Sequence, residues 1–158
     1  MTGELLAPTL GPTRTEEDFV RHIDQTIKLD PEAAYVFVSD NLNTHQSAGL
    51  VELVARLCGI EEDLGKKGKS GVLKSMKSRQ EFLSEQSHRI RFVYLPKHTS
   101  WLNQIEIVFG IVMRKVVRRG NFKSVEDLRV KLSAFFEYFN EVFAKPFNWT
   151  YTGRPLQT

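Results

Sequence analysis

Two short runs of β-branched and aromatic residues, at positions 35–39 and 89–94, restrict most strongly how this chain can fold. The first run is apolar at almost every position, which is typical of a strand buried on both faces, as in a parallel sheet. The second run is followed by Pro96, which ends it. We therefore predict one strand from each run.

Helical periodicity predicts helices before, between and after these strands. Thr15 is followed by three acidic residues, which is typical of a helix start, and Asp30-Pro31 ends that helix. The order helix–strand–helix–strand–helix–helix predicts an α/β layer protein. The helices are predicted at about 15–29, 47–57, 76–86, 101–118 and 124–143.

The 158 residues fit one domain with a core of its own. Gly and Pro residues in segment 1–13 predict a flexible N-terminal tail. Residues 14–143 form the predicted domain, residues 61–75 an exposed, flexible basic loop within it, and residues 144–158 an irregular C-terminal tail.

The net charge is +3 and the pI is near 9.0, which mildly favours a polyanionic partner. Cys58 is the single cysteine, so no internal disulfide can form and a reducing, cytoplasmic location is expected. No apolar stretch reaches the ~18–20 residues that span a bilayer, and the N-terminus does not resemble a signal peptide. We expect no membrane partner.

Glu106 lies in an apolar run, residues 105–113, that predicts a buried helix. An unpaired buried carboxylate costs several kcal/mol or loses its charge, whereas a bound cation reverses that cost. Asp40 ends the first predicted strand, where functional groups of parallel sheets gather. Oxygen ligands from Asp and Glu favour Mg²⁺ or Mn²⁺, so we predict a divalent-metal site.

Each carboxylate also has a structural interpretation. Asp40 and Asn41 are able to form an Asx-turn before the next helix. Glu106 is able to pair with Arg114 or with another arginine of the chain. The residues alone leave these alternatives open.

Polar residues accompany both acids. Asn41 and His45 follow Asp40, while Lys97 and His98 precede the helix that carries Glu106. No Cys or His spacing fits zinc, so we expect His45 and His98 to contact phosphate or their own loops. Asn103 falls near Glu106 on the helical wheel.

Two groups of basic residues flank the predicted carboxylate site, which fits a phosphate backbone contacted by Lys and Arg, although such runs are also common on solvated faces. The first group lies in and after the basic loop, and the second ends the long helix. The first is Lys66, Lys67, Lys69, Lys74, Lys77 and Arg79, and the second is Arg114, Lys115, Arg118 and Arg119.

The segment from Asp40-Asn41 to His45, followed by Pro96-Lys97-His98 and Asn103-Gln104-Ile105-Glu106, resembles the catalytic domain of D-D-E transposases. The pattern is most similar to insertion-sequence transposases of the Tc/mariner superfamily, over roughly residues 13–153.

This resemblance implies an RNase H-like, retroviral integrase-like fold with three metal-binding acids, of which Asp40 matches the second and Glu106 the third. It implies two Mg²⁺ ions that activate a water, and later a DNA 3′-hydroxyl, for attack on a phosphodiester. DNA, as element ends and as target, is the implied partner.

The family's first acid lies on a strand upstream of everything present here, and no acid of the first helix replaces it. Residues 108–110 read Val-Phe-Gly where the family usually has Trp-Phe-Ser. The resemblance therefore implies a core truncated at its N-terminus, so that the first strands of the sheet are missing. We expect this C-terminal portion of a transposase to be inactive alone.

Two further interpretations stay open. The chain is alternatively a non-catalytic DNA-binding subunit that associates with a transposase, or a plain α/β domain whose two acids are structural. The partners expected besides DNA are a second copy, as a homodimer, or an N-terminal transposase fragment.

Overall fold

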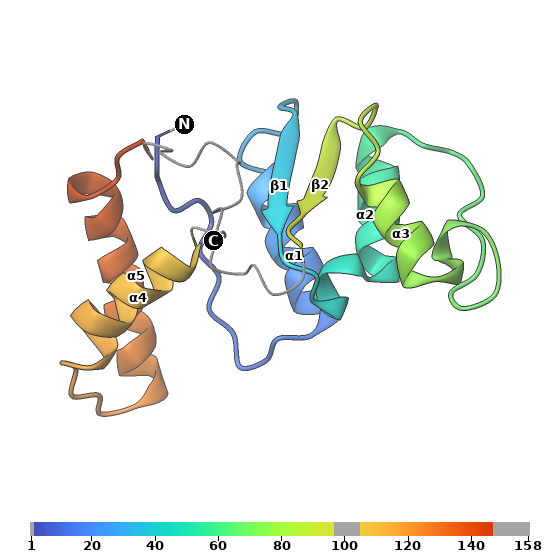
Figure 1. Cartoon of the computed structure of the whole chain (residues 1–158). Helices are drawn as coiled ribbons and strands as arrows, with labels where there is room; N and C mark the ends of the chain where they lie inside the picture. The colour runs from blue at the N-terminus through green and yellow to red at the C-terminus, as the bar shows by residue number, and fades with distance from the viewer. Residues whose placement is uncertain (1, 97–104, 147–158) are drawn as a thin grey trace, which may run out of the picture. The chain divides into compact units, whose positions relative to one another are not determined.

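The computed structural model describes residues 2–96 and 105–146, and it has a mixed α/β architecture (Figure 1). The chain divides into two units. The first unit is residues 9–111, and the second consists of residues 1–8 together with 112–158. The candidate carboxylates Asp40 and Glu106 both belong to the first unit.

In its described residues, the first unit contains two parallel strands with helices before, between and after them. In chain order its elements are α1 (Glu16–Ile27), β1 (Tyr35–Ser39), the 3₁₀ helix η1 (Asn43–Gln46), α2 (Ala48–Cys58), the 3₁₀ helix η2 (Val72–Lys74), α3 (Met76–Leu83), β2 (Ile90–Tyr94) and α4 (Ile105–Val112). The second unit contains the π-helix η4 (Met113–Val117) and α5 (Val125–Val142).

Side-chain caps explain where several helices begin. The Thr15 hydroxyl accepts a hydrogen bond from the Asp18 N–H, and the Asp18 carboxylate accepts one from the Thr15 N–H, which completes a capping box for α1. Ser75 and Ser78 form the same reciprocal pair at α3. Gly59 ends α2 at φ 68°, a left-handed conformation that glycine adopts without steric cost.

The sheet has one face packed on the core. β1 and β2 pair in parallel, with Tyr35 opposite Ile90 and Ser39 opposite Tyr94. On the core face the rings of Phe37 and Phe92 stack with centroids 5.1 Å apart. Because the strands are parallel, their carboxyl ends lie at the same edge of the sheet.

The opposite face of the sheet differs from the sequence-based expectation. Val36 is 53% exposed and Val38 is 54% exposed, so β1 is not buried on both faces as we predicted. Side chains alternate between the two faces of a strand, and α1 and α2 pack against the other one. An apolar run thus identified the strand but not the number of its covered faces.

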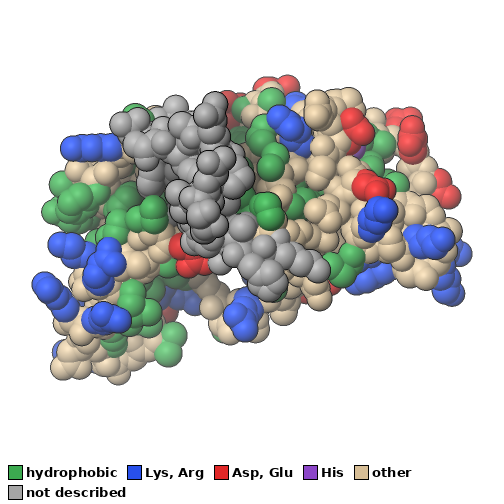
Figure 2. All heavy atoms as spheres, viewed as in Figure 1, with side chains coloured by type: hydrophobic (Ala, Val, Ile, Leu, Met, Phe, Trp, Pro, Cys, Tyr) green, Lys and Arg blue, Asp and Glu red, His purple; other side chains and the backbone are tan. Residues whose placement is uncertain are grey.

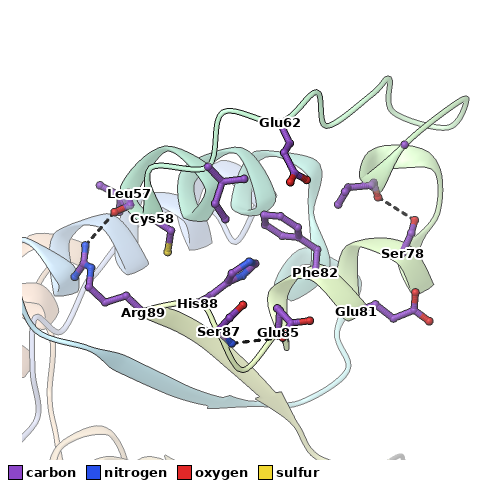
Figure 3. A pocket seen from close by; sticks show the side chains of 13 residues that line it. Leu57, Cys58, Glu62, Ser78, Glu81, Phe82, Glu85, Ser87, His88 and Arg89 are labelled. Carbon is purple, nitrogen blue, oxygen red and sulfur yellow. Dashed lines mark hydrogen bonds between the residues drawn. The ribbon is translucent and has the colours of Figure 1, made fainter.

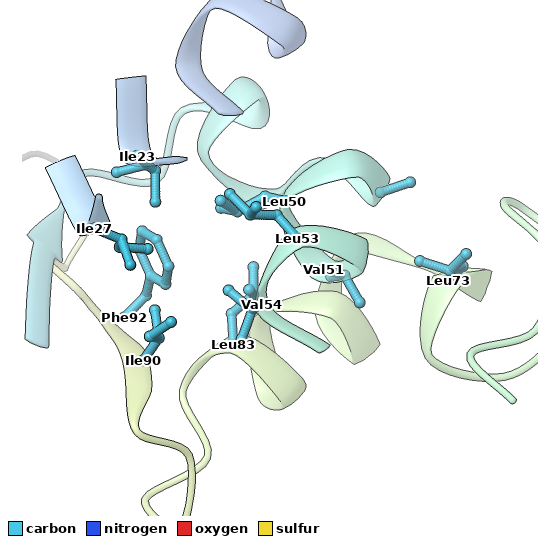
Figure 4. Close-up of a cluster of buried hydrophobic side chains, with 11 residues drawn as sticks. Ile23, Ile27, Leu50, Val51, Leu53, Val54, Leu73, Leu83, Ile90 and Phe92 are labelled. Carbon is cyan, nitrogen blue, oxygen red and sulfur yellow. The ribbon is translucent and has the colours of Figure 1, made fainter. Parts of the chain in front are cut away.

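The core of the first unit joins α1, α2, α3 and the sheet (Figure 4). Leu50 and Val54 of α2 are fully buried between Ile27 of α1 and Phe92 of β2. Burying a side chain of this kind stabilises a fold by about 1.5–3 kcal/mol. The core therefore fixes the loops that emerge from the strand ends.

The basic loop, residues 61–75, is folded back on itself. The Leu73 N–H donates to the Leu64 carbonyl, and the Lys66 N–H donates to the Ser70 carbonyl. Gly71 has φ 61°, and a Cβ there would lie 2.6 Å from the Leu64 carbonyl oxygen. Buried Leu73 anchors the loop, while Lys66, Lys67 and Lys69 are exposed.

The second unit holds part of the predicted N-terminal tail against α5. The Leu5 N–H donates to Asn140 Oδ1 at 2.8 Å, and Asn140 Nδ2 donates to the Leu5 carbonyl at 3.0 Å. A Cβ at Gly3 would lie 2.0 Å from the Lys145 carbonyl oxygen, so only glycine allows this close approach. None of the helices in the described ranges combines the length and the hydrophobicity needed to cross a bilayer.

Candidate functional site

Asp40 directly follows β1 and is held by its own loop. Its Oδ1 accepts a hydrogen bond from the Leu42 N–H at 3.1 Å, which is the Asx-turn that the sequence allowed. The same oxygen lies 2.6 Å from Nδ1 of His45. The Asp40 side chain is 46% exposed, and its Oδ2 has no hydrogen bond or ion pair to another described residue. The turn orients the carboxylate and leaves one oxygen for a ligand.

His45 connects Asp40 to the core. An ionised carboxylate only accepts hydrogen bonds, so the contact with Asp40 places a proton on Nδ1 of the imidazole. Nδ1 also lies 2.8 Å from the hydroxyl of buried Ser39, and the ring packs on Phe19 with centroids 4.1 Å apart. His45 therefore acts on Asp40 as an orienting residue.

Tyr94, the last residue of β2, holds the backbone of His45. Its O–H donates to the His45 carbonyl at 2.8 Å. Burial raises the pKa of the Tyr94 phenol, which keeps this donor protonated. At the same edge of the sheet, the Leu95 N–H donates to the Ser39 carbonyl at 2.8 Å. The ends of both strands are thus joined around the Asp40 loop.

Asn41 is the centre of an amide network. Its Nδ2 donates to the Leu95 carbonyl, and its Oδ1 accepts from Nε2 of Gln46 at 3.1 Å and from Nε2 of Gln80 at 3.5 Å. The sequence predicted Asn41 as a supporting residue but did not single out Gln46 or Gln80. Gln46, five residues after Asn41, is 2% exposed.

Arg79 corrects one part of the predicted basic surface. We assigned it to the exposed lysines of the basic loop, but it is 9% exposed. Its Nε donates to the Gln46 carbonyl at 2.7 Å, and its Nη1 donates to the Leu73 carbonyl at 3.1 Å. The sequence contained a signal for this burial, because Arg79 precedes Leu83 by four residues and so lies on the same, buried face of α3. Arg79 ties the basic loop to η1.

Glu106 lies in the first turn of α4 and is exposed, which contradicts the predicted burial of this helix. Val108 is buried, while Ile107 is 50% and Phe109 is 58% exposed. Within residues 2–96 and 105–146, Glu106 forms no ion pair, and its side chain is exposed. The expected cost of burial therefore gives no support for a cation at this position.

The structure describes only some of the residues of the predicted metal site. Lys97, His98 and Asn103 lie outside the described residues. Within residues 2–96 and 105–146, no group of three or more His, Cys, Asp or Glu side chains is arranged to hold a metal ion. The accessible oxygens of Asp40 and Glu106 are of the kind that Mg²⁺ prefers, but two carboxylates are a sparse donor set.

The predicted DNA contacts that the structure describes are exposed in both units: Lys66, Lys67, Lys69, Arg114, Arg118 and Arg119. In the first unit, Lys67 forms an ion pair with Glu16 at 3.3 Å, so its charge is partly compensated. In the second unit, Arg114, Arg118 and Arg119 have no acidic partner among the described side chains. Figure 2 shows several Lys and Arg side chains on the surface of this second unit.

Comparison with known proteins supplies one match. A family model described as DDE superfamily endonuclease matches residues 1–129. No curated protein and no solved structure matched the chain.

Proposed function

The chain belongs to the family of DDE superfamily endonucleases, and on that premise we propose that it carries part of a transposase catalytic domain. Cleavage and strand transfer at DNA phosphodiesters is the chemistry of this proposal. The observation that carries it is the placement of Asp40, which follows β1 at the edge where both parallel strands end. That edge is where functional groups gather in parallel sheets.

The proposed architecture is an RNase H-like core of the Tc/mariner type. The parallel pair β1 and β2, with α1 and α2 packed on one face, is compatible with such a core. The Asp40 loop and the α4 helix correspond to the two acidic motifs that the sequence pattern identified.

Asp40 and Glu106 are the residues that we propose to hold Mg²⁺ or Mn²⁺. When bound, such a cation supplies Lewis-acid activation of a water or 3′-hydroxyl and stabilises charge on the phosphate. The protein's contribution is orientation. The Leu42 N–H and His45 hold Oδ1 of Asp40, and Tyr94 holds His45, which leaves Oδ2 without a partner among the described residues.

DNA is the substrate that this family membership implies. We propose that exposed lysines of the basic loop, together with Lys97, His98 and the arginines after α4, contact its phosphates. Phosphate contacts of this kind position DNA without reading its sequence. The ends and the target that are recognised are therefore not encoded in these residues.

We further propose that a polypeptide of residues 1–158 does not cleave DNA by itself. Two-metal chemistry requires ions ~3.5–4 Å apart, and the two carboxylates in motif positions are too few to hold both. The test is an end-cleavage assay with Mg²⁺ or Mn²⁺ titrated into the purified polypeptide. Metal-dependent cleavage that Asp40→Asn and Glu106→Gln abolish would contradict the proposed inactivity and support the proposed site.

The assay has a companion measurement that addresses the site directly. Mn²⁺ broadens NMR signals of nearby nuclei, so amides around Asp40 should broaden at low Mn²⁺ concentrations. Asp40→Asn should remove the effect, whereas Glu52→Gln, an exposed acid on α2, should not. Equal broadening in both variants would contradict a metal-binding role for Asp40.

A non-catalytic DNA-binding subunit is the second candidate function. Residues 112–146 contain eight Lys and Arg against four Asp and Glu, so basic charge is concentrated away from the Asp40 loop in the sequence. Salt-dependent DNA binding that is unchanged by Asp40→Asn and Glu106→Gln would favour this candidate.

A further inference from the structure

A cavity of about 860 Å³ lies in the first unit (Figure 3). It is at the opposite end of the sheet from Asp40. It is lined by the end of α2, the basic loop, α3 and the turn before β2. Its residues Ser87, His88 and Arg89 precede β2, whereas Asp40 follows β1. Because the strands are parallel, about 16 Å of sheet separates the two places.

The walls of this cavity are apolar on one side and aromatic at the base. Leu57, Ile60 and Val72 supply aliphatic surface, and the ring of Phe82 contacts the imidazole of His88 with centroids 4.7 Å apart. A ligand with an apolar stem would therefore replace water along these side chains.

One polar atom at the base has no partner. Nδ1 of His88 is buried, and no described residue forms a hydrogen bond with it. In the tautomer that carries its proton on Nε2, this nitrogen is an acceptor. Buried acceptors are usually satisfied, and a turn of the imidazole about its side-chain bond would bring this atom to a donor group that enters the cavity.

The charges at the rim are negative. Glu62 points from the loop after α2 toward Phe82, and Glu85 stands on the α3 side (Figure 3). Arg89 supplies one positive charge to the lining, and two of its N–H groups are held by the carbonyls of Ala33 and Leu57. Three carboxylates of the lining, those of Glu62, Glu81 and Glu85, outnumber this one cation, so an anionic ligand would meet a net negative charge.

From this combination we propose that the cavity binds a primary ammonium group carried on an apolar stem of about four or five carbons. The stem lies on the aliphatic wall and the Phe82 ring, and the ammonium group donates to Nδ1 of His88 and to the carboxylate of Glu62. Attraction between a cation and the face of an aromatic ring adds to this binding. The same chemistry occurs in a free aliphatic amine and in a lysine side chain of a polypeptide.

The test is an NMR titration of the ¹⁵N-labelled chain with n-pentylamine hydrochloride, in parallel with n-pentanol and sodium pentanoate. Pentylammonium should give saturable shifts confined to residues near 57–62 and 82–89. A dissociation constant of about 1 mM is expected for so small a ligand. Pentanol should bind more weakly, and pentanoate should not bind.

Two variants separate the cavity from general charge attraction. Glu62→Gln should weaken pentylammonium binding about three- to tenfold, because it removes the charge and keeps the shape. Glu52→Gln makes the same change on the exposed face of α2, outside the cavity, and should leave binding unchanged. Equal binding of pentanol and pentylammonium, shifts spread over the whole surface, or indifference to Glu62→Gln would each overturn the proposal.

A second pair of probes distinguishes the two sources of the ammonium group. The peptide acetyl-Gly-Lys-Gly-amide and free pentylamine are titrated in the same way. Binding of the peptide with at least equal affinity assigns the cavity to a lysine side chain, and binding of the amine alone assigns it to a small molecule. Failure of both overturns the proposal and leaves the proposed nuclease function unaffected, because that function rests on Asp40 and Glu106.

Discussion

At the scale of single residues, the Asp40 loop owes its conformation to side chains that come from three different elements. Asp40 itself was identifiable, because an acid after an apolar strand is a local pattern. Tyr94, Gln46 and Gln80 were not identifiable, since each acts through a contact that only the folded chain creates. Local sequence therefore predicted the acid but not the groups that orient it.

Replacement of Tyr94 by phenylalanine tests the hydrogen bond to the His45 carbonyl. It removes one O–H donor from a half-buried acceptor, so the free energy of unfolding should fall by about 1 kcal/mol in urea titrations. Tyr138→Phe removes a hydroxyl from a tyrosine that is 49% exposed and should change stability by less than about 0.5 kcal/mol. Equal effects of the two variants would argue against a specific role of Tyr94.

Replacement of Arg79 by methionine tests the link between the basic loop and η1. The Gln46 carbonyl would lose the Arg79 donor and the Leu73 carbonyl would keep only the Gly68 N–H, which should cost about 1–3 kcal/mol in the free energy of unfolding. Trypsin should then cleave faster after Lys66 to Lys69. Lys77→Met, on the exposed side of the same helix, is the matched control, and equal cleavage rates would refute the link.

At the scale of elements, the helices were the best predicted part of the fold. Five helices were expected, and α1, α2, α3 and α5 begin within about two residues of the predicted positions because their caps are local in sequence. Burial was predicted less well. The exposed α4 residues and the open face of β1 could not be inferred, because burial depends on which distant element packs against a face.

Carboxylates at the N-termini of α1 and α5 make the stability of the fold depend on pH in the acidic range. The pKa of Asp18 is lowered to about 2, first by the hydrogen bond from the Thr13 hydroxyl and then by the Thr15 N–H. The pKa of Asp127 is also lowered, first by the Lys123 N–H. A lowered pKa stabilises the fold above the unfolded value of 3.8, and this stabilisation disappears as the pH falls toward 2.

The corresponding experiment compares thermal unfolding of the natural chain and Asp18→Asn by circular dichroism. The natural chain should melt at the higher temperature at pH 5, and the difference should vanish between about pH 4 and pH 2. Thr13→Val, which keeps the carboxylate and removes its first donor, should show part of this loss. Melting temperatures that stay parallel over the whole range would contradict the assigned role of Asp18.

At the scale of the whole molecule, charge is distributed unevenly along the chain. Residues 9–111 contain thirteen Lys and Arg against fourteen Asp and Glu, so the surplus of positive charge comes from the second unit. Composition gives only the net charge of the whole chain, +3. The division into two units, which composition does not reveal, shows which residues carry this surplus.

DNA binding by the arginines after α4 has a quantitative signature. In the variant with Arg114, Arg118 and Arg119 all changed to Gln, the slope of log K against log salt concentration should become shallower by about 0.9 for each phosphate that is no longer neutralised. The matched control changes Lys28, Lys77 and Arg129 to Gln, which removes equal charge from cations already paired on their own helices. Identical slopes in both triple variants would exclude the arginines as phosphate-binding residues.

The contact between Leu5 and Asn140 has a mechanical consequence. It joins a residue before and a residue after residues 9–111. Those residues therefore form a loop in the chain that this contact closes. In an optical-tweezers experiment with handles at residues 2 and 146, tension would reach that contact first. Residues 9–111, which carry Asp40 and Glu106, would bear no force until that contact broke. The force–extension curve should therefore show first a smaller step, from the second unit, and then a larger step, from residues 9–111.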